Sequence, residues 1–480
     1  MLIRQTLAYL PAQILSPLTQ FATAIILTHY LPPDGYGLTM LIFASQELIY
    51  QGLMSWWASY YLRYAGSHED PERQAALKRT ESTVLLLTTV LQLLATLLLV
   101  RIVSPDAPAL LYAAAAFYVI TRGILGYLSE RARREGDILA YSLMQIGGPL
   151  GGLVLTLAMM TVLTVEPARV LLDFAISHFV VSLVIAWRLG LFVRPGRADR
   201  AIIGAALGFG APILISNIFG WFAAHGIRFV VQYGASATAL GLLSVGWGIA
   251  IRITAVAAMV VAAAAYPLAI RAMERGDVDG ARNQISANSA LLLGLIAPST
   301  VGIIAISEPF VALLVAQEYL ATTVAILPWA LVGSAIRNLR MHGWDQMYLL
   351  FEAPRAMVIL EFIEAVLTAL CAFIGLMTHG LVGAVAGAAI AAAIIALADY
   401  AYLNRRFGLH APLSFYLRIM LATGLMYLAL ASLPQLGIMI RPEWNSIAWA
   451  VLIGGAVYGV LIVALFPKMV LGFLRRPGRA

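Results

Sequence analysis

The sequence predicts an all-α polytopic membrane protein of about 14 transmembrane helices, built as two pseudo-symmetric six-helix lobes plus two C-terminal helices. Composition is the first observation behind this prediction: 61% of the 480 residues are hydrophobic and 11% are charged, whereas a soluble domain carries roughly 25% charged residues. Apolar segments of about 20 residues, the length of a membrane-spanning helix, also recur along the whole chain. A repeat near the middle of the sequence indicates the two lobes.

The predicted spans follow from this length criterion. They lie at residues 7–29, 36–62, 82–103, 108–128, 138–163, 170–191, 201–224, 238–266, 286–307, 319–338, 356–378, 381–403, 413–434 and 445–467. The first segment is too long for a cleavable signal peptide, is interrupted by Pro11 and lacks a small-residue cleavage site, so we expect it to remain as a helix. The longest connection, residues 63–81, is mixed in charge and is expected to form a helix along the cytoplasmic surface.

Basic residues fall on alternate connections, which supports this order of spans. About 24 of the 31 Lys and Arg residues lie on one side, and the positive-inside rule assigns that side to the cytoplasm. The opposite side carries only Arg101, Arg169, Arg228 and Arg441. We therefore expect a multi-pass protein of the cell inner membrane with both termini in the cytoplasm. The net charge of +7 then reflects orientation, and no nucleic-acid partner is expected.

An internal repeat relates the two halves of the chain. The segment LAYLPAQILS at residues 7–16 resembles LGFGAPILIS at residues 207–216, and each is followed by a Gly-containing turn and a second apolar span. Six spans separate the two segments, so both enter the membrane in the same direction, which predicts parallel repeats. The predicted division is 1–195 for the first lobe, 196–408 for the second lobe, and 409–480 for the last two helices and a cytoplasmic tail.

Polar residues form one helical face in four of the spans, the first two of each half. These faces comprise Tyr9, Gln13, Ser16, Gln20 and Thr23 in the first span, Glu47, Gln51, Ser55 and Ser59 in the second, Asn217, Trp221 and His225 in the seventh, and Ser244, Trp247 and Arg252 in the eighth. Together they predict a polar cavity between the lobes. The alternative for any one residue is that it only hydrogen-bonds neighbouring helices together, as Ser, Thr, Asn and Gln do in membranes.

Three ionisable residues lie deep in the predicted spans. An ionised side chain there costs about 2.5 to 3.5 kcal/mol on insertion scales, so it marks a bundle interior or a water-filled path. Counted from the outer ends of their spans, Glu47 lies roughly 17 Å deep and Arg252 roughly 21 Å deep. We expect these two to face each other across the lobe interface, as a salt bridge or as a binding pair. Arg122 in the fourth span either pairs within the first lobe or extends toward the cytoplasm.

A group of acidic residues lies in the last spans of the second lobe. Glu361 and Glu364 share one helical face by their spacing of three, and Asp399 in the next span is expected near them. Two interpretations stay open: ion pairs with basic residues at the membrane edge, or a relay for protons or cations. The candidate basic partners are Arg337, Arg340, Arg355 and Arg405.

The sequence contains no enzyme signature. It has no Gly-rich nucleotide loop followed by Lys, no HExxH pattern and no GxSxG pattern, each of which would indicate a phosphate, zinc or nucleophile site. The single cysteine, Cys371, excludes an internal disulfide and a multi-cysteine metal site. We expect no catalytic activity, no cofactor and no metal. The short outer connections also disfavour a glycan polymerase or ligase.

Four segments resemble the polysaccharide transporter family of lipid-linked oligosaccharide flippases, a branch of the multidrug, oligosaccharidyl-lipid and polysaccharide exporter superfamily. They are HYLPPDGYG after the first span, RFVVQYGASATALGLLSVGWGIA across spans 7 and 8, LLVAQEYLATTVAILPWAL before span 10, and HGLVGAVAGAAIAAAI in span 12. The resemblance covers about residues 5 to 410. Many relatives carry an acidic residue just before the RFVV-like segment, whereas this chain has Gly226 and Ile227 there. Any role of that acidic residue is therefore in doubt here.

This resemblance implies two lobes forming a V, with spans 1, 2, 7 and 8 lining the cavity. It implies a flippase that moves an isoprenoid-diphosphate-linked oligosaccharide repeat unit by alternating access for polysaccharide export, in contact with membrane lipids and with polymerase or export machinery. Arg252, with Arg122, would bind the diphosphate because guanidinium presents a planar fork to phosphate oxygens. The remaining substrate-binding candidates are Glu47, Gln13, Gln20, Gln51, Asn217, Trp221, His225 and Trp247. The alternative is a multidrug or cation antiporter of the same superfamily.

Without a nucleotide site, transport would draw on a proton or sodium gradient or run downhill as polymerisation removes the product. Glu47 is the first candidate for ion coupling because it lies in the predicted cavity. The second candidates are Glu361, Glu364 and Asp399.

Overall fold

The structure, a computed structural model, describes residues 2–64, 71–190 and 196–467. Within these ranges every regular element is helical and none is a strand. The predicted all-α class is confirmed. The C-terminal tail from residue 468 lies outside the described residues, and so do the basic residues that the orientation prediction counts there.

Eleven helices in the described part of the chain are long and apolar enough to cross a membrane. One of them, α16 (Pro354–Phe407), contains two of the predicted spans, because its backbone leaves helical geometry at His379 and Gly380. A shorter apolar helix covers Leu15–Thr28. The chain is therefore a multi-pass membrane protein, and its number of spans comes near the predicted count of about 14.

The chain divides into two compact units, residues 1–244 and residues 245–480, with the division inside helix α11 (Ala237–Glu274). This division follows packing, whereas the predicted domains 1–195, 196–408 and 409–480 follow the sequence repeat. The repeat-based division therefore stays a prediction. Each unit is described below by itself.

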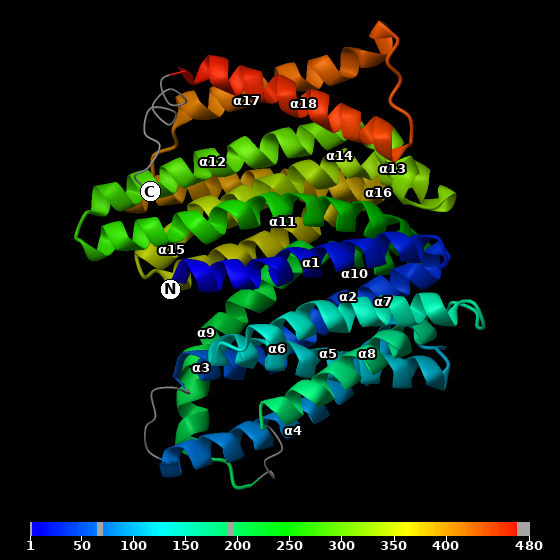
Figure 1. The fold of residues 1–480 in the computed structure, drawn as a ribbon, viewed down its shortest axis with the longest axis vertical. Coiled ribbons are helices and arrows are strands. Elements are labelled where there is room, and N and C mark those ends of the chain that lie inside the picture. The colour runs from blue at the N-terminus through cyan, green and yellow to red at the C-terminus, as the bar shows by residue number, and fades with distance from the viewer. Residues whose placement is uncertain (1, 65–70, 191–195, 468–480) are drawn as a thin grey trace. The chain divides into compact units, whose positions relative to one another are not determined.

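The first unit packs its helices around α5 and α8, which lie side by side in Figure 1. Its elements are α1 (Leu2–Thr28), α2 (Pro33–Leu53), α3 (Ser55–Tyr64), α4 (Pro71–Val103), α5 (Ala109–Glu135), α6 (Ile138–Ser142), the π-helical η1 (Leu143–Gly147), α7 (Gly148–Met159), α8 (Pro167–Arg188), α9 (Arg200–His225), α10 (Ile227–Gly234) and the start of α11. Helix α9 packs against α2 and α3, and Gly210 allows its backbone to approach Trp56. Helices α2 and α9 are thereby brought together.

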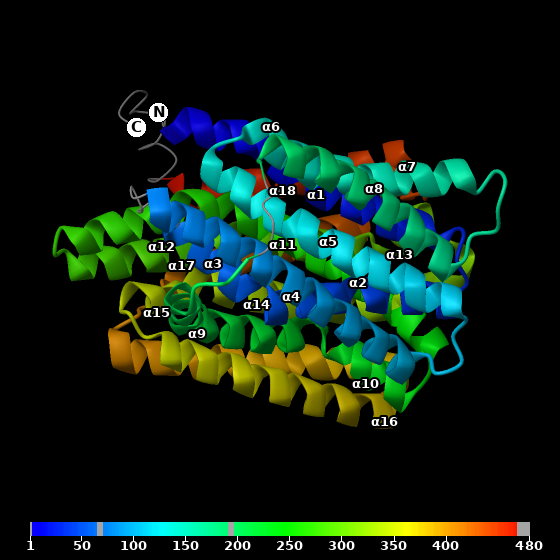
Figure 2. The ribbon, with the colours of Figure 1, turned by 90° about the horizontal axis from the view of Figure 1, so that it is seen from below.

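The second unit contains a helical hairpin, which is formed by the single long element α16. Its elements after α11 are α12 (Val278–Ala305), α13 (Ser307–Leu314), α14 (Gln317–Leu339), the π-helical η2 (Arg340–Trp344), α15 (Gln346–Leu350), α16, α17 (Leu413–Ser432), the short 3₁₀ helix η3 (Leu433–Leu436) and α18 (Trp444–Leu465). The two arms of α16 run side by side and join at Gly380, whose φ of 62° and ψ of −148° suit only glycine (Figure 2). Gly375 and Gly383 meet backbone to backbone across the hairpin.

Two details of the predicted spans are wrong. Residues 71–81 do not form a separate surface helix, because α4 begins at Pro71 and continues without a break to Val103. The segment AALKRTE contains strong helix formers and no breaker, so the span extends into it. The second span is interrupted at Met54, which separates α2 from α3.

Close contact between α2 and the start of α11 gives a stability prediction. A Cβ added at Gly241 would lie 1.7 Å from the Pro33 carbonyl oxygen, whereas one added at Gly204 in α9 would meet no atom within 4 Å. Alanine in place of glycine normally favours a helix by about 1 kcal/mol. We therefore expect Gly241→Ala to lower the melting temperature of the detergent-purified protein and Gly204→Ala to leave it unchanged or raise it. Equal melting temperatures would contradict the close packing of α2 on α11.

Candidate functional site

Polar side chains from four helices of the first unit form one group, which we call the first-unit cluster. Its members come from α2, α5, α9 and α10: Glu47, Gln51, Arg122, Asn217, Trp221, His225 and Arg228. Asn217 Nδ2 donates to Gln51 Oε1 at 3.1 Å, and Trp221 Nε1 donates to the Ala44 carbonyl oxygen at 3.1 Å. The polar faces predicted for spans 2 and 7 therefore meet each other.

Arg228, His225 and Glu47 form a chain of polar contacts. Arg228 Nη1 donates to His225 Nδ1 at 2.5 Å, and His225 Nε2 lies 3.8 Å from Glu47 Oε2. Arginine has only donors, so Nδ1 must accept, and the ring proton of the neutral imidazole is then on Nε2, facing the Glu47 carboxylate. His225 thus links a guanidinium to a carboxylate.

Arg228 is a member of the cluster that sequence reasoning missed. It is predicted on the outer connection between the seventh and eighth spans, and the structure places it in α10, a short helix between α9 and α11, with 7% of its surface exposed. Its spacing of three from His225 places both side chains on one helical face. That spacing is the signal that could have identified it.

Arg122 adds a second guanidinium to the first-unit cluster. It is half-buried in α5, and the electrostatic field at Glu47 comes first from Arg122 and then from Arg228. Within the described residues, no hydrogen bond or ion pair reaches the Arg122 side chain, so the ion pair expected for it inside the first lobe is not formed there. The cluster holds two guanidiniums and one carboxylate, which leaves an excess of positive charge among these four helices of the first unit.

Among the described residues, the polar face of the first span contacts η1, which in turn contacts α5, and not the first-unit cluster. Ser16 Oγ donates to Gln145 Oε1 at 3.4 Å, Gln20 Nε2 donates to Ser16 Oγ at 3.4 Å, and Gln145 Nε2 donates to Ser129 Oγ at 2.9 Å. For Ser16 the structure therefore agrees with the alternative in which polar residues join helices within one lobe. Gln20 is exposed, and the side chain of Gln13 lies outside the described part of the structure.

Two candidate residues of the eighth span belong to the second unit. Arg252 Nη1 donates to the Gly248 carbonyl oxygen at 3.1 Å within α11, and Trp247 is buried. Because Glu47 belongs to the first unit and Arg252 to the second, the structure does not test their pairing. That pairing stays a prediction.

The second unit contains a buried ionic network around Arg340, which is 1% exposed. Arg340 contacts Asp345 at 3.0 Å, Glu361 at 3.7 Å and Glu364 at a shorter distance. Arg337 contacts Glu361 at 3.6 Å and Glu364 at 3.1 Å. The predicted alternative in which Glu361 and Glu364 pair with basic residues therefore holds for Arg337 and Arg340.

Two aspartates complete this network, which we call the second-unit network. Tyr348 Oη donates to Asp399 Oδ1 at 2.6 Å, and the carboxyls of Asp399 and Asp345 also interact with each other. Asp399 is therefore near Glu361 and Glu364, as predicted. Asp345 is missed by sequence reasoning, because it follows a π-helical turn at the end of its span and carries no periodic signal.

The charges of the second-unit network do not balance. It contains four carboxyls, from Asp345, Glu361, Glu364 and Asp399, each no more than 2% exposed, but only two guanidiniums. Arg355 and Arg405, the other two predicted partners, are exposed and form no ion pair in the described residues. The excess is negative, opposite in sign to that of the first-unit cluster. No group of three or more His, Cys, Asp or Glu side chains in the described chain has the geometry of a metal site.

Comparison with known proteins identifies the family. The profile of a family described as "Polysaccharide biosynthesis protein" matches residues 82–324, which is half of the chain. The chain belongs to this family. The predicted family is thereby confirmed, whereas no curated protein matches the sequence.

Solved structures confirm the fold of this polysaccharide biosynthesis protein. "Lipid II flippase MurJ, inward closed conformation" superposes with a TM-score of 0.70 at 14% identity, covering 96% of this chain and 99% of that chain. An inward-facing multidrug resistance MATE family transporter of the MOP superfamily gives 0.63 at 18% identity, covering 84% and 98%. A MOP superfamily transporter from Pyrococcus furiosus gives 0.55 at 17% identity, covering 85% and 95%. The chain therefore has the fold of these transporters.

The second-unit network predicts a large loss of stability when its central cation is removed. Removing one partner of a buried ionic group costs about 3–5 kcal/mol, because it leaves charge without compensation. We expect Arg340→Met, which removes the charge and leaves an unbranched apolar side chain, to lower the melting temperature strongly. The matched control is Arg355→Met, which removes an exposed arginine on the same unit. Similar melting temperatures for the two variants would show that Arg340 does not compensate these carboxylates.

Proposed function

We propose that this protein is a flippase that moves an isoprenoid-diphosphate-linked oligosaccharide from the cytoplasmic to the outer leaflet of the inner membrane. Its family works in polysaccharide biosynthesis, and its fold is that of transporters. The observation that carries the proposal is the excess of positive charge in the first-unit cluster. A substrate with a diphosphate supplies the anion that such a cluster lacks, and its lipid tail can remain in the bilayer.

Arg122 and Arg228 are the residues that would bind the diphosphate in the first unit. Guanidinium presents planar, bidentate donors that match phosphate oxygens, and charge-assisted hydrogen bonds of this kind are roughly twice as strong as neutral ones. Arg252 would add a third guanidinium from the second unit. Gln51, Asn217 and Trp221 offer amide and aromatic surfaces for sugars.

Two other functions fit the observations less well. A cation or multidrug antiporter shares the fold, but a cationic substrate would meet two guanidiniums and one carboxylate in the first-unit cluster. A glycan polymerase or ligase would need a sizeable outer domain for its acceptor. The connections between α4 and α5 and between α7 and α8, both predicted outside, contain only residues 104–108 and 160–166. We therefore assign transport and no catalytic activity.

Ion coupling is proposed at two places. In the first-unit cluster, Glu47 faces the His225 ring, so a proton or Na⁺ at Glu47 would change the charge near Arg122 and Arg228. In the second-unit network, four carboxyls face two guanidiniums, so a bound proton would reduce the excess of negative charge. A ligand that binds one conformation better than the other supplies the bias for alternating access. Polymerase and export machinery in the same pathway would remove the product.

Removal of the cluster guanidiniums tests the substrate. Each lost contact to a charged group costs about 1.5–3 kcal/mol, which corresponds to roughly 10- to 100-fold. We expect Arg122→Gln, Arg228→Gln and Arg252→Ala each to reduce flipping of a fluorescent isoprenoid-diphosphate-linked sugar in proteoliposomes by this factor, and Lys variants to recover part of it. The exposed Arg441→Gln is the control. Normal flipping by all three variants would rule out a guanidinium site for diphosphate.

Imposed gradients test the coupling. If Glu47 couples transport to an ion, a proton or sodium gradient should change the flipping rate and final distribution for the wild type but not for Glu47→Gln. If the second-unit network couples transport to an ion, Glu361→Gln or Asp399→Asn should abolish the change in flipping rate that the gradient causes in the wild type. If neither gradient changes the flipping rate or the final distribution for the wild type and for Glu47→Gln, ion coupling through Glu47 is wrong and the protein is an uncoupled facilitator.

A further inference from the structure

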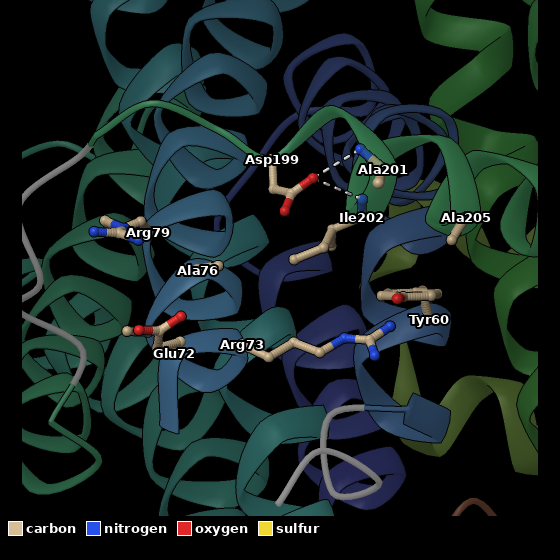
Figure 3. Close-up of a pocket in the computed structure, with 10 residues that line it drawn as sticks. Tyr60, Glu72, Arg73, Ala76, Arg79, Asp199, Ala201, Ile202 and Ala205 are labelled. Carbon is tan, nitrogen blue, oxygen red and sulfur yellow. Dashed lines mark hydrogen bonds between the residues drawn. The ribbon is translucent and has the colours of Figure 1, made fainter. Parts of the chain in front are cut away.

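A pocket opens in the first unit where three helix ends meet on the side predicted to face the cytoplasm. Its volume is about 730 Å³, and it lies between the end of α3 and the starts of α4 and α9. Figure 3 shows its lining residues, which are Tyr60, Glu72, Arg73, Ala75, Ala76, Arg79, Asp199, Ala201, Ile202 and Ala205. None of them belongs to the first-unit cluster or to the second-unit network. The proposed transport mechanism therefore does not involve this pocket.

The wall of the pocket combines arginines with apolar side chains. Arg73 extends across it toward Tyr60, whereas Arg79 lies on the other side of α4, on the same side as Glu72 (Figure 3). Ala76 and Ile202 provide apolar surface beside them. Both arginines are exposed, and no carboxylate forms an ion pair with either one within the described residues. Such a site suits a ligand with an anionic part joined to an apolar part.

The acidic groups of the pocket do not cancel these arginines. Asp199 caps α9, where its Oδ1 accepts from the backbone N–H groups of Ala201 at 2.8 Å and Ile202 at 3.4 Å (Figure 3). A carboxylate at this position interacts with the positive end of the helix dipole. Glu72 is exposed at the start of α4. Further exposed basic residues surround the pocket on the same unit: Arg63, Lys78, Arg197 and Arg200.

The pocket also lies at the depth of lipid head groups. The polar segment 72–81 of α4 precedes its apolar segment, and Asp199 directly precedes the membrane-spanning α9. Basic residues next to a span attract the anionic lipids of the cytoplasmic leaflet. A cavity of this volume falls within the range of about 300–1,000 Å³ that small-molecule sites occupy.

We propose that this pocket binds the phosphate head group of an anionic phospholipid of the cytoplasmic leaflet through Arg73, while Arg79 adds positive charge on the other side of α4. Tyr60 would donate its hydroxyl to the same phosphate, and Ala76 and Ile202 would contact the glycerol and the first methylenes. Because the pocket joins α3, α4 and α9, a bound lipid would stabilise their contact. The inference does not depend on the transported substrate.

Lipid retention in a full-length, nanodisc-reconstituted protein tests this proposal. The probes are phosphatidylglycerol in a phosphatidylcholine bilayer and phosphatidylcholine alone. Native mass spectrometry reports the phosphatidylglycerol retained per protein, and the melting temperature reports stabilisation. The test variant is Arg73→Gln/Arg79→Gln. The control is Lys78→Gln, which removes a positive charge from the same exposed segment of α4 outside the pocket.

We expect phosphatidylglycerol to raise the melting temperature of the wild type and of Lys78→Gln, and retention to fall about tenfold in the double variant. Equal retention by the double variant and Lys78→Gln would overturn the proposal in favour of diffuse surface attraction. No stabilisation of the wild type by phosphatidylglycerol would also overturn it. In a third arm, isoprenoid diphosphate replaces phosphatidylglycerol. If only that probe is retained and the double variant loses it, the pocket takes the substrate head group and the phospholipid assignment is wrong.

Discussion

The free energy of a charge inside lipid is the constraint on which the structure depends. Hydrocarbon supplies no hydrogen bonds, so partners on neighbouring helices stabilise a guanidinium or carboxylate in a span. In the first unit, Arg131 at the end of α5 contacts Glu81 of α4 at 2.8 Å and Glu135 at 2.8 Å. In the second unit, Arg340 directly follows α14 and contacts Asp345 at 3.0 Å. The fourth span of each predicted lobe thus ends in a buried arginine that joins other elements of its unit.

Two groups of charges in the described residues are unbalanced, in opposite directions. The first-unit cluster keeps more guanidiniums than carboxylates, and the second-unit network keeps more carboxyls than guanidiniums. An imbalance of this kind is costly in an empty protein, and it is reduced when an anion or a proton binds. On this argument we propose both groups as binding sites.

The sequence predicts the helices well because span length and polar periodicity are local properties. The polar faces of spans 2 and 7 meet as expected, since Gln51 and Asn217 lie on regular helices. Sequence reasoning fails where tertiary contacts decide. Met54 interrupts span 2, Asp345 joins its network only because a π-helical turn reorients it, and Arg228 is buried by the fold of α10. The pocket between α3, α4 and α9 is also invisible in the sequence, because α9 lies far along the chain from α3 and α4.

The magnitudes are sufficient for a diphosphate to drive a conformational change. Moving a two-state equilibrium from 1:99 to 99:1 requires about 5.5 kcal/mol of differential binding. Two charge-assisted contacts at about 1.5–3 kcal/mol each supply roughly 3–6 kcal/mol, and a third from Arg252 would raise the total to roughly 4.5–9 kcal/mol. This holds only if the contacts form in one conformation and not in the other. A site that closed around the diphosphate equally in both would bind it tightly and transport nothing. In the proposed mechanism, a proton at Glu47 would change the diphosphate affinity of one conformation relative to the other. It would remove the negative charge at the end of the contacts that run from Arg228 through His225 to Glu47.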